Sequence, residues 1–388
     1  MWRWIGLGLL ALLIVIFGFS LIDSSAGNSI TASAQFAGIS ADTTGYSRAI
    51  APYDWHFPQD FGAHPDFQTE WWYYTGNVET AEGRHFGYQF TIFRRAIQPP
   101  ASRATPTSEW RSDQVYMVHF AVTDVSGGQY YHQQRFSRGG AELAGATADP
   151  LYHVWLEDWQ IKAEDQQATR TTIQADAGDF AVDLRLEQIK PPALQGINGL
   201  SPKSAEPGNA SYYYSLSRLL TSGSIRIGSD TFAVSGATWQ DHEFSTSALG
   251  SDAQGWDWFG LQLDDGRELM LGQIRLHDGG REPAFGGLLV NADGTTRYLK
   301  SEDFTFEVTG QWQSPHSGAT YPAGWSITIN TGAVQPLHLT LTPLLADQEL
   351  HGSGGVDYWE GAVQISGDAA GYGYAELTGY AQTMTGRF

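Results

Sequence analysis

Two carboxylates lie close together in the segment 239–243, whose sequence is WQDHE. In a strand, side chains alternate between two faces, so Trp239, Asp241 and Glu243 share one face and His242 points to the other. Two carboxylates on one face repel each other, which raises the pKa of one and leaves it a proton to donate. A general acid needs this property. A turn or a salt-bridge network at a domain junction explains the same residues, so both interpretations stay open.

A second acid, Glu70, begins the aromatic run EWWYY at residues 70–74. As a strand, this run places Glu70, Trp72 and Tyr74 on one face, and the other face is also aromatic. A carboxylate buried there must be paired or protonated, because an isolated buried charge is very costly. Pairing with Arg94 is one interpretation, and a binding role in a pocket is the other.

Three further segments combine an acid with large aromatic residues. Trp256 and Trp258 flank Asp257, Tyr358 precedes Glu360, and the strand pattern at 374–380 places four side chains on one face: Tyr374, Glu376, Thr378 and Tyr380. Cores rarely accept carboxylates, so five such strands are difficult to explain as core alone. The sequence therefore predicts that these groups converge on one apolar hollow.

Other catalytic classes find little support. The eleven histidines are scattered, without HExxH, H-x-H or a calcium-loop pattern, so no metal site is predicted. His119 lies in an alternating strand, where most histidines belong to the core and a pocket role is the alternative. The chain has no G-x-S-x-G elbow and no cysteine. The net charge of -20 argues against nucleic acid as a partner.

The elements that must position these groups are strands. Phe86, Tyr88, Phe90 and Ile92 alternate with other residues, and many similar short runs are separated by turn signals such as Asp293-Gly294. Many short strands indicate a sandwich or barrel. The length of 388 residues suggests two or three domains at ~150 residues each. An aromatic-strand pattern at 71–94 that returns at 256–275 weakly supports two related β-domains in tandem.

The predicted organisation has four parts. Residues 1–26 form a signal peptide or membrane anchor, because Ile5 to Ile22 is apolar and uncharged and Arg3 precedes it. Residues 27–50 form a flexible tether. The N-terminal β-domain is predicted at 51–222, ending after the Pro- and Gly-rich stretch 191–209, and the C-terminal β-domain at 223–388. The chain is then extracytoplasmic, either secreted or held at the membrane by its N-terminal segment.

Taken together, the motifs resemble the AttH / carotenoid 1,2-hydratase family from about Tyr53 onward. The segments that carry the resemblance are His64-Pro65, Glu70 to Gly76, Gly87-Tyr88-Gln89, Phe93-Arg94, Leu194 to Ser201, Ala210 to Ser215, Trp239 to Glu243, Gly255 to Phe259, Asp264 to Arg267 and Gly373 to Tyr380. The resemblance implies an all-β fold of two tandem lipocalin-like antiparallel barrel or sandwich domains. It also implies hydratase chemistry by His, Trp, Tyr and Asp side chains.

The predicted function is a cofactor-independent hydratase that adds water to a C=C bond of an apolar isoprenoid or carotenoid-like substrate. Asp241 is the predicted acid, Glu243 raises its pKa, and His242 is the predicted base, provided that a bulge turns it toward Asp241. Tyr358 and Glu376 are alternates. The predicted ligand-binding residues are Glu70, Trp72, Tyr74, Gln89, His119, Trp239, Trp256, Trp258, Tyr374 and Tyr380. A non-catalytic lipocalin-like carrier of an apolar molecule and a secreted hydrolase are the alternatives, and the protein is predicted to be a monomer.

Overall fold

The computed structural model describes residues 42–103, 108–246, 249–352 and 356–385. The apolar segment predicted at residues 5–22 lies outside them, as does most of the predicted tether. Within these ranges, no helix has the length and apolar character needed to cross a bilayer. The regular elements of the described residues are strands, apart from short 3-10 turns at η1 (Gln59–Phe61), η2 (Pro100–Ser102), η3 (Gly140–Glu142) and η4 (Ser301–Asp303).

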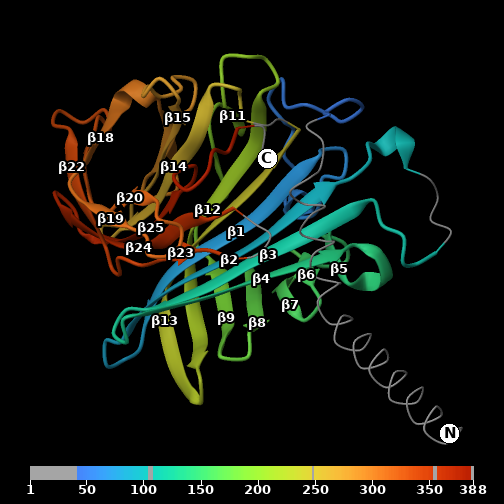
Figure 1. The fold of residues 1–388 in the computed structure, drawn as a ribbon, viewed down its shortest axis with the longest axis horizontal. Helices are drawn as coiled ribbons and strands as arrows, with labels where there is room; N and C mark the ends of the chain where they lie inside the picture. Colours follow the sequence, from blue (N-terminus) through green and yellow to red (C-terminus); the bar gives the residue numbers. More distant parts are fainter. Residues whose placement is uncertain (1–41, 104–107, 247–248, 353–355, 386–388) are drawn as a thin grey trace, which may run out of the picture.

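The first sheet contains 13 of the described strands in the order β4-β3-β2-β1-β13-β12-β9-β8-β7-β6-β5, with β10 and β11 paired to β12. It curls until β3 and β4 lie beside β5 and β6, which nearly closes a barrel (Figure 1). Its strands are β1 (Thr69–Glu79), β2 (His85–Ala96), β3 (Gln114–Asp124), β4 (Gln129–Arg138), β5 (Ala144–Thr147), β6 (His153–Leu156), β7 (Trp159–Ala163), β8 (Arg170–Asp176), β9 (Phe180–Gln188), β10 (Ala193–Leu194), β11 (Leu200–Pro202), β12 (Ala210–Ile227) and β13 (Asp230–Ser245).

The second sheet has the order β17-β16-β15-β14-β25-β24-β22-β21-β18, and β23 pairs with β24. It forms the second barrel, at the upper left of Figure 1. Its strands are β14 (Ala253–Leu263), β15 (Glu268–Leu276), β16 (Gly287–Val290), β17 (Thr296–Leu299), β18 (Phe304–Val308), β21 (Trp325–Ile329), β22 (Leu337–Pro343), β23 (Glu349–Leu350), β24 (Tyr358–Gly367) and β25 (Gly371–Leu377), with a separate hairpin of β19 (Gln311–Gln313) and β20 (Thr320–Pro322).

The prediction of an all-β chain with two tandem barrels is confirmed, but the division between them differs from the predicted one. The sheets separate between β13 and β14, whereas residue 222 lies inside β12. The Pro- and Gly-rich stretch does not act as a linker, because β10 and β11 fold back onto the first half of β12. The second half of β12 pairs with β9, so the strand crosses the predicted boundary without interruption.

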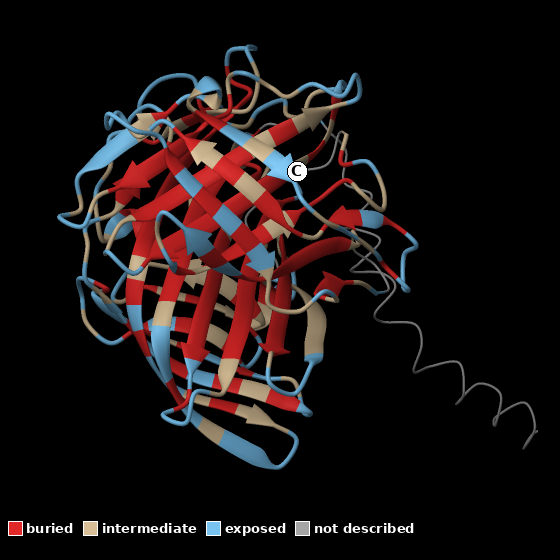
Figure 2. Cartoon of the chain, turned by 90° about the vertical axis from the view of Figure 1, so that its left-hand side faces the viewer, coloured by how far each residue is buried: buried red, intermediate tan, exposed pale blue. Residues whose placement is uncertain are grey.

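Alternation of side chains produces several apolar clusters, and the three largest lie inside or between the barrels. One fills the first barrel and includes Trp72, Phe120 and Trp159, and one fills the second barrel and includes Phe259 and Trp325. A third cluster lies between the barrels, where the outer faces of β1, β2 and β12 pack against β25, β24 and β14. Several central strands are therefore buried on both faces, and buried residues run almost continuously along them (Figure 2).

A buried ion network also joins the barrels. Glu268 of β15 is fully buried, and its carboxylate binds Lys190 at 2.7 Å and Arg218 of β12 at 2.6 Å. The Lys190 ammonium also donates to the carbonyl oxygens of Gly266 and Asn291. Two cations of the first barrel thus share one carboxylate of the second, and removing it would leave both largely buried without a counter-charge.

We expect Glu268→Gln to lower the free energy of unfolding by about 3 kcal/mol or more, because Lys190 and Arg218 would keep their burial and lose their partner. Urea unfolding followed by tryptophan fluorescence measures the change. Glu302→Gln is the matched control, since Glu302 is exposed and its contact with Lys300 is 3.7 Å long. Equal midpoints for the two variants would contradict the role of the network.

Candidate functional site

A row of polar side chains crosses the outer face of the first sheet. Strand pairing sets Ser215 of β12 opposite Asp241 of β13, Asp241 opposite Tyr73 of β1, Tyr73 opposite Thr91 of β2, and Thr91 opposite His119 of β3. Directly paired residues point to the same side of a sheet, so all five face the second barrel. The spacing of each strand was visible in the sequence, but the row exists only because of this register.

The second sheet presents an acidic row to the first. Trp258 of β14 is paired with Glu376 of β25, and Glu376 is paired with Glu360 of β24. The two rows meet: the rings of Tyr73 and Trp258 pack edge to face at 5.1 Å, and His119 Nδ1 lies 2.7 Å from the Tyr358 hydroxyl. We name the inter-barrel cluster by six residues, namely Tyr73, His119, Asp241, Tyr358, Glu360 and Glu376.

Asp241 is held by three donors. The Tyr213 hydroxyl donates to Oδ2 at 2.5 Å, and the Ser215 hydroxyl and the Trp239 indole N–H donate to Oδ1 at 2.5 and 2.6 Å. Burial raises the pKa of Asp241 to about 7, although these donors oppose the increase and the charge of Glu243 adds to it. Asp241 therefore exchanges a proton near neutral pH while its orientation stays fixed.

Glu360 and Glu376 form a coupled pair across neighbouring strands. Burial, followed by the nearby charge of Glu376, raises the pKa of Glu360 well above its usual range, while the phenols of Tyr73 and Tyr358 oppose the increase. Burial raises the pKa of Glu376 to about 7. Two adjacent buried carboxyl groups cannot both ionise at low cost, so the pair holds a proton at neutral pH.

His119 remains neutral in this environment. Burial lowers its pKa to about 3, and the positive charge of His132 contributes to the decrease. The ring also packs edge to face against Phe93 at 5.1 Å, which fixes its plane. A neutral imidazole beside a phenol and a carboxyl group can accept a proton from a water molecule that becomes strongly acidic during a reaction.

The sequence predictions divide between two faces of the first sheet. The inter-barrel face carries Asp241, Gln89, His119 and Trp239, and the second barrel brings Tyr358, Glu376, Trp258 and Tyr374 to it. Trp256 lies beside Glu376, and Glu243 forms an ion pair with Lys203 at 2.7 Å.

The remaining predicted residues lie elsewhere. Trp72 and Tyr74 belong to the core of the first barrel, and the Tyr380 hydroxyl donates to Asp257, which binds Arg275 at 3.0 Å. His242 and Glu70 face away from Asp241, because β13 pairs with β1 in unbroken register and the bulge needed to turn His242 is absent from this segment.

His242 and Glu70 belong instead to a buried network on the inner face. Both histidines, His64 through Nδ1 and His242 through Nε2, contact Oε1 of Glu70 at 2.8 Å, and Arg94 donates to Oε2 at 2.7 Å. Burial would raise the pKa of Glu70, but Arg94 and the histidines hold it well below its usual range. The predicted pairing of Glu70 with Arg94 is thus observed.

The ligand atoms of His64, Glu70 and His242 lie within 4.8 Å of one another, a spacing that could hold a metal ion. Arg94 already balances the carboxylate, however, and the Tyr214 hydroxyl lies 2.9 Å from the other His242 nitrogen. These interactions fit a structural network better than a metal centre, because a cation would have to compete with Arg94 for the carboxylate.

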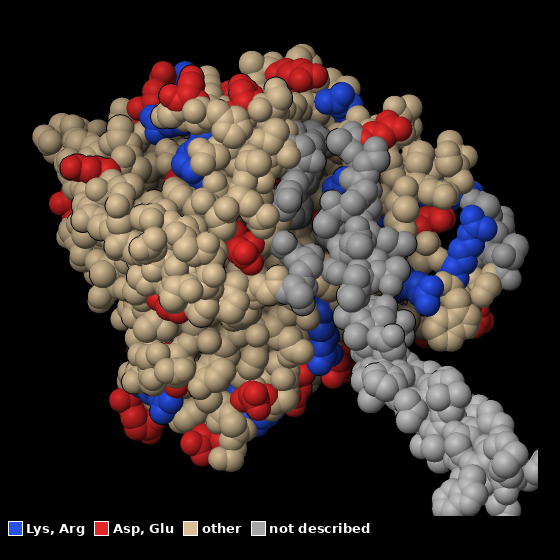
Figure 3. Space-filling model, viewed as in Figure 1, with Lys and Arg blue, Asp and Glu red and all other residues tan. Residues whose placement is uncertain are grey.

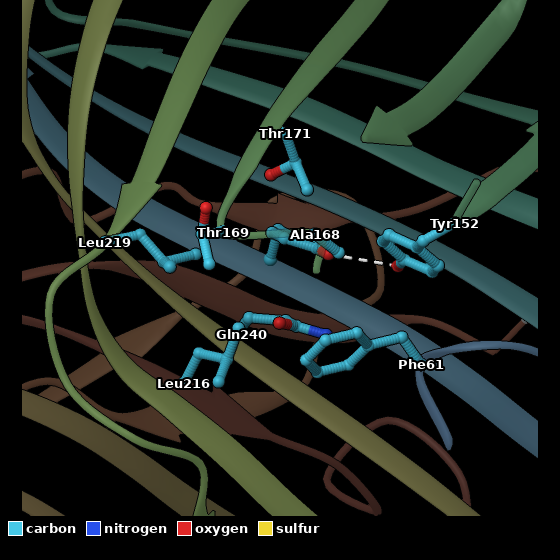
Figure 4. Close-up of a pocket in the computed structure, with 9 residues that line it drawn as sticks. Phe61, Tyr152, Ala168, Thr169, Thr171, Leu216, Leu219 and Gln240 are labelled. Carbon is cyan, nitrogen blue, oxygen red and sulfur yellow. Dashed lines mark hydrogen bonds between the residues drawn. The ribbon is translucent and has the colours of Figure 1, made fainter. Parts of the chain in front are cut away.

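A small pocket lies inside the first barrel, above the inner face of β12 and β13 (Figure 4). Tyr74 and Tyr152 share a hydrogen bond of 3.1 Å at one side of it. It is lined by Phe61, Tyr74, Tyr152, Ala168, Thr169, Thr171, Leu216, Leu219 and Gln240. Its lining residues bring no ionisable group other than phenols, so acid–base chemistry belongs to the inter-barrel cluster rather than to this pocket.

Sequence reasoning did not select Tyr73, Thr91, Tyr213 or Ser215 as site residues, and it placed Glu360 in the predicted hollow without assigning it a role. Tyr73 was recognised only as lying on the opposite face from Glu70, and that face is the one that meets the second barrel. The sequence does contain a signal for Tyr213 and Ser215. In a strand these two residues share one face with Ser211, and all three side chains on that face bear a hydroxyl group. Pairing of β12 with β13 converts that signal into a site.

The raised pKa of Glu376 makes stability depend on pH. Some carboxyl groups have a higher pKa in the folded state than in the unfolded state. Such a group stabilises the fold at any pH below its unfolded-state pKa, and it loses this contribution as the pH rises through its folded-state pKa. For Glu376 this window runs from 4.5 to about 7, which corresponds to on the order of 3 kcal/mol. Glu376→Gln should therefore unfold at a higher urea concentration than the parent at about pH 8 and show little difference at about pH 4.

Urea titrations of both proteins across this pH range measure the effect. Glu302→Gln, at an exposed position, should follow the parent at every pH. A Glu376→Gln protein less stable than the parent at high pH would show that the ionised carboxylate supports the fold.

The family model for AttH-like proteins matches residues 48–380. A structure described as AttH from Nitrosomonas europaea is 36% identical, with a TM-score of 0.75, and the match covers 86% of this chain and 99% of that one. None of the curated proteins matches.

Two more distant structures share the fold alone. Kievitone hydratase from Nectria haematococca is 16% identical with a TM-score of 0.62, and the match covers 87% of this chain and 97% of that one. CghA is 12% identical with a TM-score of 0.50, and the match covers 87% and 97%. The tandem lipocalin-like architecture predicted from the sequence is thereby confirmed, and the chain belongs to the AttH-like family.

Proposed function

We propose that this protein is a cofactor-independent hydratase that adds water to a C=C bond of an isoprenoid-type substrate bound between the two barrels. The observation that carries the proposal is the inter-barrel cluster, in which Asp241 and the Glu360–Glu376 pair hold protons near neutral pH among aromatic rings. The fold shared with kievitone hydratase supports a reaction of this class.

Asp241 is the proposed acid. Protonation of an alkene carbon by its carboxyl group breaks the π bond and leaves a carbocation on the neighbouring carbon. The hydrogen bonds from Tyr213, Ser215 and Trp239 then stabilise the carboxylate that remains. The Trp239 and Trp258 rings, 6.0 Å apart, offer π faces to the cation, worth about 2 kcal/mol when desolvated.

Water completes the reaction by attacking the cation, and the resulting oxonium group must lose a proton. His242, the base predicted from the sequence, lies on the other side of the sheet and is bonded to Glu70. We propose His119 in its place, because its imidazole is neutral and bonded to Tyr358. An oxonium ion is far more acidic than an imidazolium ion, so even an imidazole of low pKa accepts this proton. Exchange with water returns a proton to Asp241.

We also propose, from the apolar segment 5–22, an extracytoplasmic location at or near the membrane, where a lipid-dissolved isoprenoid is accessible. On the face shown in Figure 3, the basic side chains of the described residues are scattered among acidic ones and form no continuous patch. This charge pattern supports a partner other than nucleic acid.

Mass spectrometry of extracts after incubation with lycopene-type acyclic polyenes tests the activity through a gain of one water. Heavy-oxygen water identifies the origin of the added oxygen. We expect Asp241→Asn to lower the rate by ~10²–10⁴-fold, since the amide cannot donate a carboxyl proton. Asp230→Asn is the control, because Asp230 lies on the same strand in an exposed position. Full activity of Asp241→Asn would remove Asp241 from the mechanism, and polyene retained without conversion would indicate a carrier.

The rate should also depend on pH in one direction around neutrality. Asp241 donates only when protonated, so kcat is expected to fall as pH rises through about 7. His119 stays neutral over this range, because its pKa is about 3. A rate that increases between about pH 6 and about pH 8 would identify an ionised carboxylate, rather than the acid form, as the active species.

A further inference from the structure

Several buried polar groups of the inter-barrel face have no well-formed hydrogen bond to another described residue. They are His119 Nε2, the Gln89 amide oxygen and the Thr75 hydroxyl, and the carboxyl group of Glu360 lies near them between the Tyr73 and Tyr358 phenols. Each of these side chains is at most 3% exposed. A buried polar group without a partner costs about as much as a lost hydrogen bond, and several of them on one face need a common explanation.

Their positions follow from the same register that builds the cluster. Thr75 is paired with Gln89, and His119 lies in the adjacent row on the same face. Glu360 approaches from the second barrel beside Tyr73 and Tyr358, and Tyr358 contacts His119. The unpartnered groups follow β1, β2 and β3, and Thr75 is the direct cross-strand partner of Trp239, so a polar end of the proposed site adjoins an aromatic end.

We infer that the ligand of this site is an apolar skeleton that bears hydroxyl groups, rather than a pure hydrocarbon. The inference rests on the location given by the proposed function and specifies its substrate class. A hydroxyl group both donates and accepts, so it satisfies the neutral imidazole of His119, the Gln89 amide oxygen and the Thr75 hydroxyl alike. A hydrocarbon would cover these polar groups and exclude water from them, and it would offer no hydrogen bonds in place of those that the water made.

The aromatic end defines the remainder of the ligand. The Trp258 ring packs edge to face with both Tyr73 and Trp239, and Trp71 and Trp256 lie at the margin of the same apolar cluster. Such a wall fits an isoprenoid chain or a ring. The structure therefore assigns the hydroxyl-bearing end of the ligand to β1–β3 and β24, and the apolar end to β13 and β14.

Binding of three probes with one skeleton tests this inference: farnesol, its methyl ether and farnesene. Quenching of tryptophan fluorescence reports binding, because Trp239 and Trp258 line the site. We expect farnesol to bind about tenfold more tightly than farnesene, with the methyl ether between them because it can accept but not donate. Equal affinities, tighter binding of farnesene, or no binding of farnesol would overturn the inference.

Variants locate the preference. Gln89→Leu should weaken the binding of farnesol and strengthen the binding of farnesene. The ratio of the two affinities should therefore decrease. Gln174→Leu is the matched control on an exposed position of β8 and should leave the ratio unchanged. Gln89→Leu also removes the hydrogen bond from Gln89 Nε2 to the Thr91 hydroxyl at 2.6 Å, so the ratio of the two affinities, and not the melting temperature, is the decisive measurement. An unchanged ratio in Gln89→Leu would remove Gln89 from the polar end.

The same probes separate this inference from the proposed function. Binding is measured in the Asp241→Asn protein as well as in the parent, and conversion is followed independently by mass spectrometry. A preference for farnesol without conversion of any alkene would reject the hydratase proposal alone. Conversion of farnesene by a protein that does not discriminate farnesol from farnesene would reject the ligand class alone.

Discussion

The packing of one barrel's outer face against the other's is the constraint on which the site depends. Each outer face would be solvent-exposed in an isolated barrel, and Asp241, Glu360 and Glu376 would then ionise as ordinary carboxylates. Contact between the sheets removes these groups from water and raises their pKa values. The ion network around Glu268 holds the barrels together at the edge of the same contact, so a structural interaction sustains the chemical one.

The two faces of one strand, β13, lie in different electrostatic environments. Asp241 faces the second barrel, where burial favours its neutral form and the charge of Glu243 adds to this preference. His242, the next residue, faces the interior of the first barrel and contacts Glu70, whose charge Arg94 stabilises. Adjacent residues thus experience different fields because the sheet between them separates two compartments. Alternation along the strand is sufficient to separate a chemical role from a structural one.

Local pattern predicted the faces correctly, and it could not predict the partners. The alternation that placed Asp241 and His242 on opposite sides, and Glu70 opposite Tyr73, is what the structure shows. That Tyr73 meets Asp241 depends on the pairing of β1 with β13, which are far apart in the chain and carry no local signal of their register. The domain boundary was misplaced for a related reason, since β12 hydrogen-bonds to β10 and β11 in one half and to β9 in the other, and turn-forming residues alone suggested an interruption.

The order of strands along the chain has a consequence for biosynthesis. Tyr73 can meet Asp241 only after the chain between β1 and β13 has been made, and β24 and β25 follow every other described strand. Contacts between such distant segments form late and slowly, because the intervening loop must first lose its conformational freedom. We therefore expect a nascent chain to complete the first barrel while its polar row is still hydrated. Docking of the second barrel would then remove water from Asp241 only after its three hydrogen-bond donors are in place.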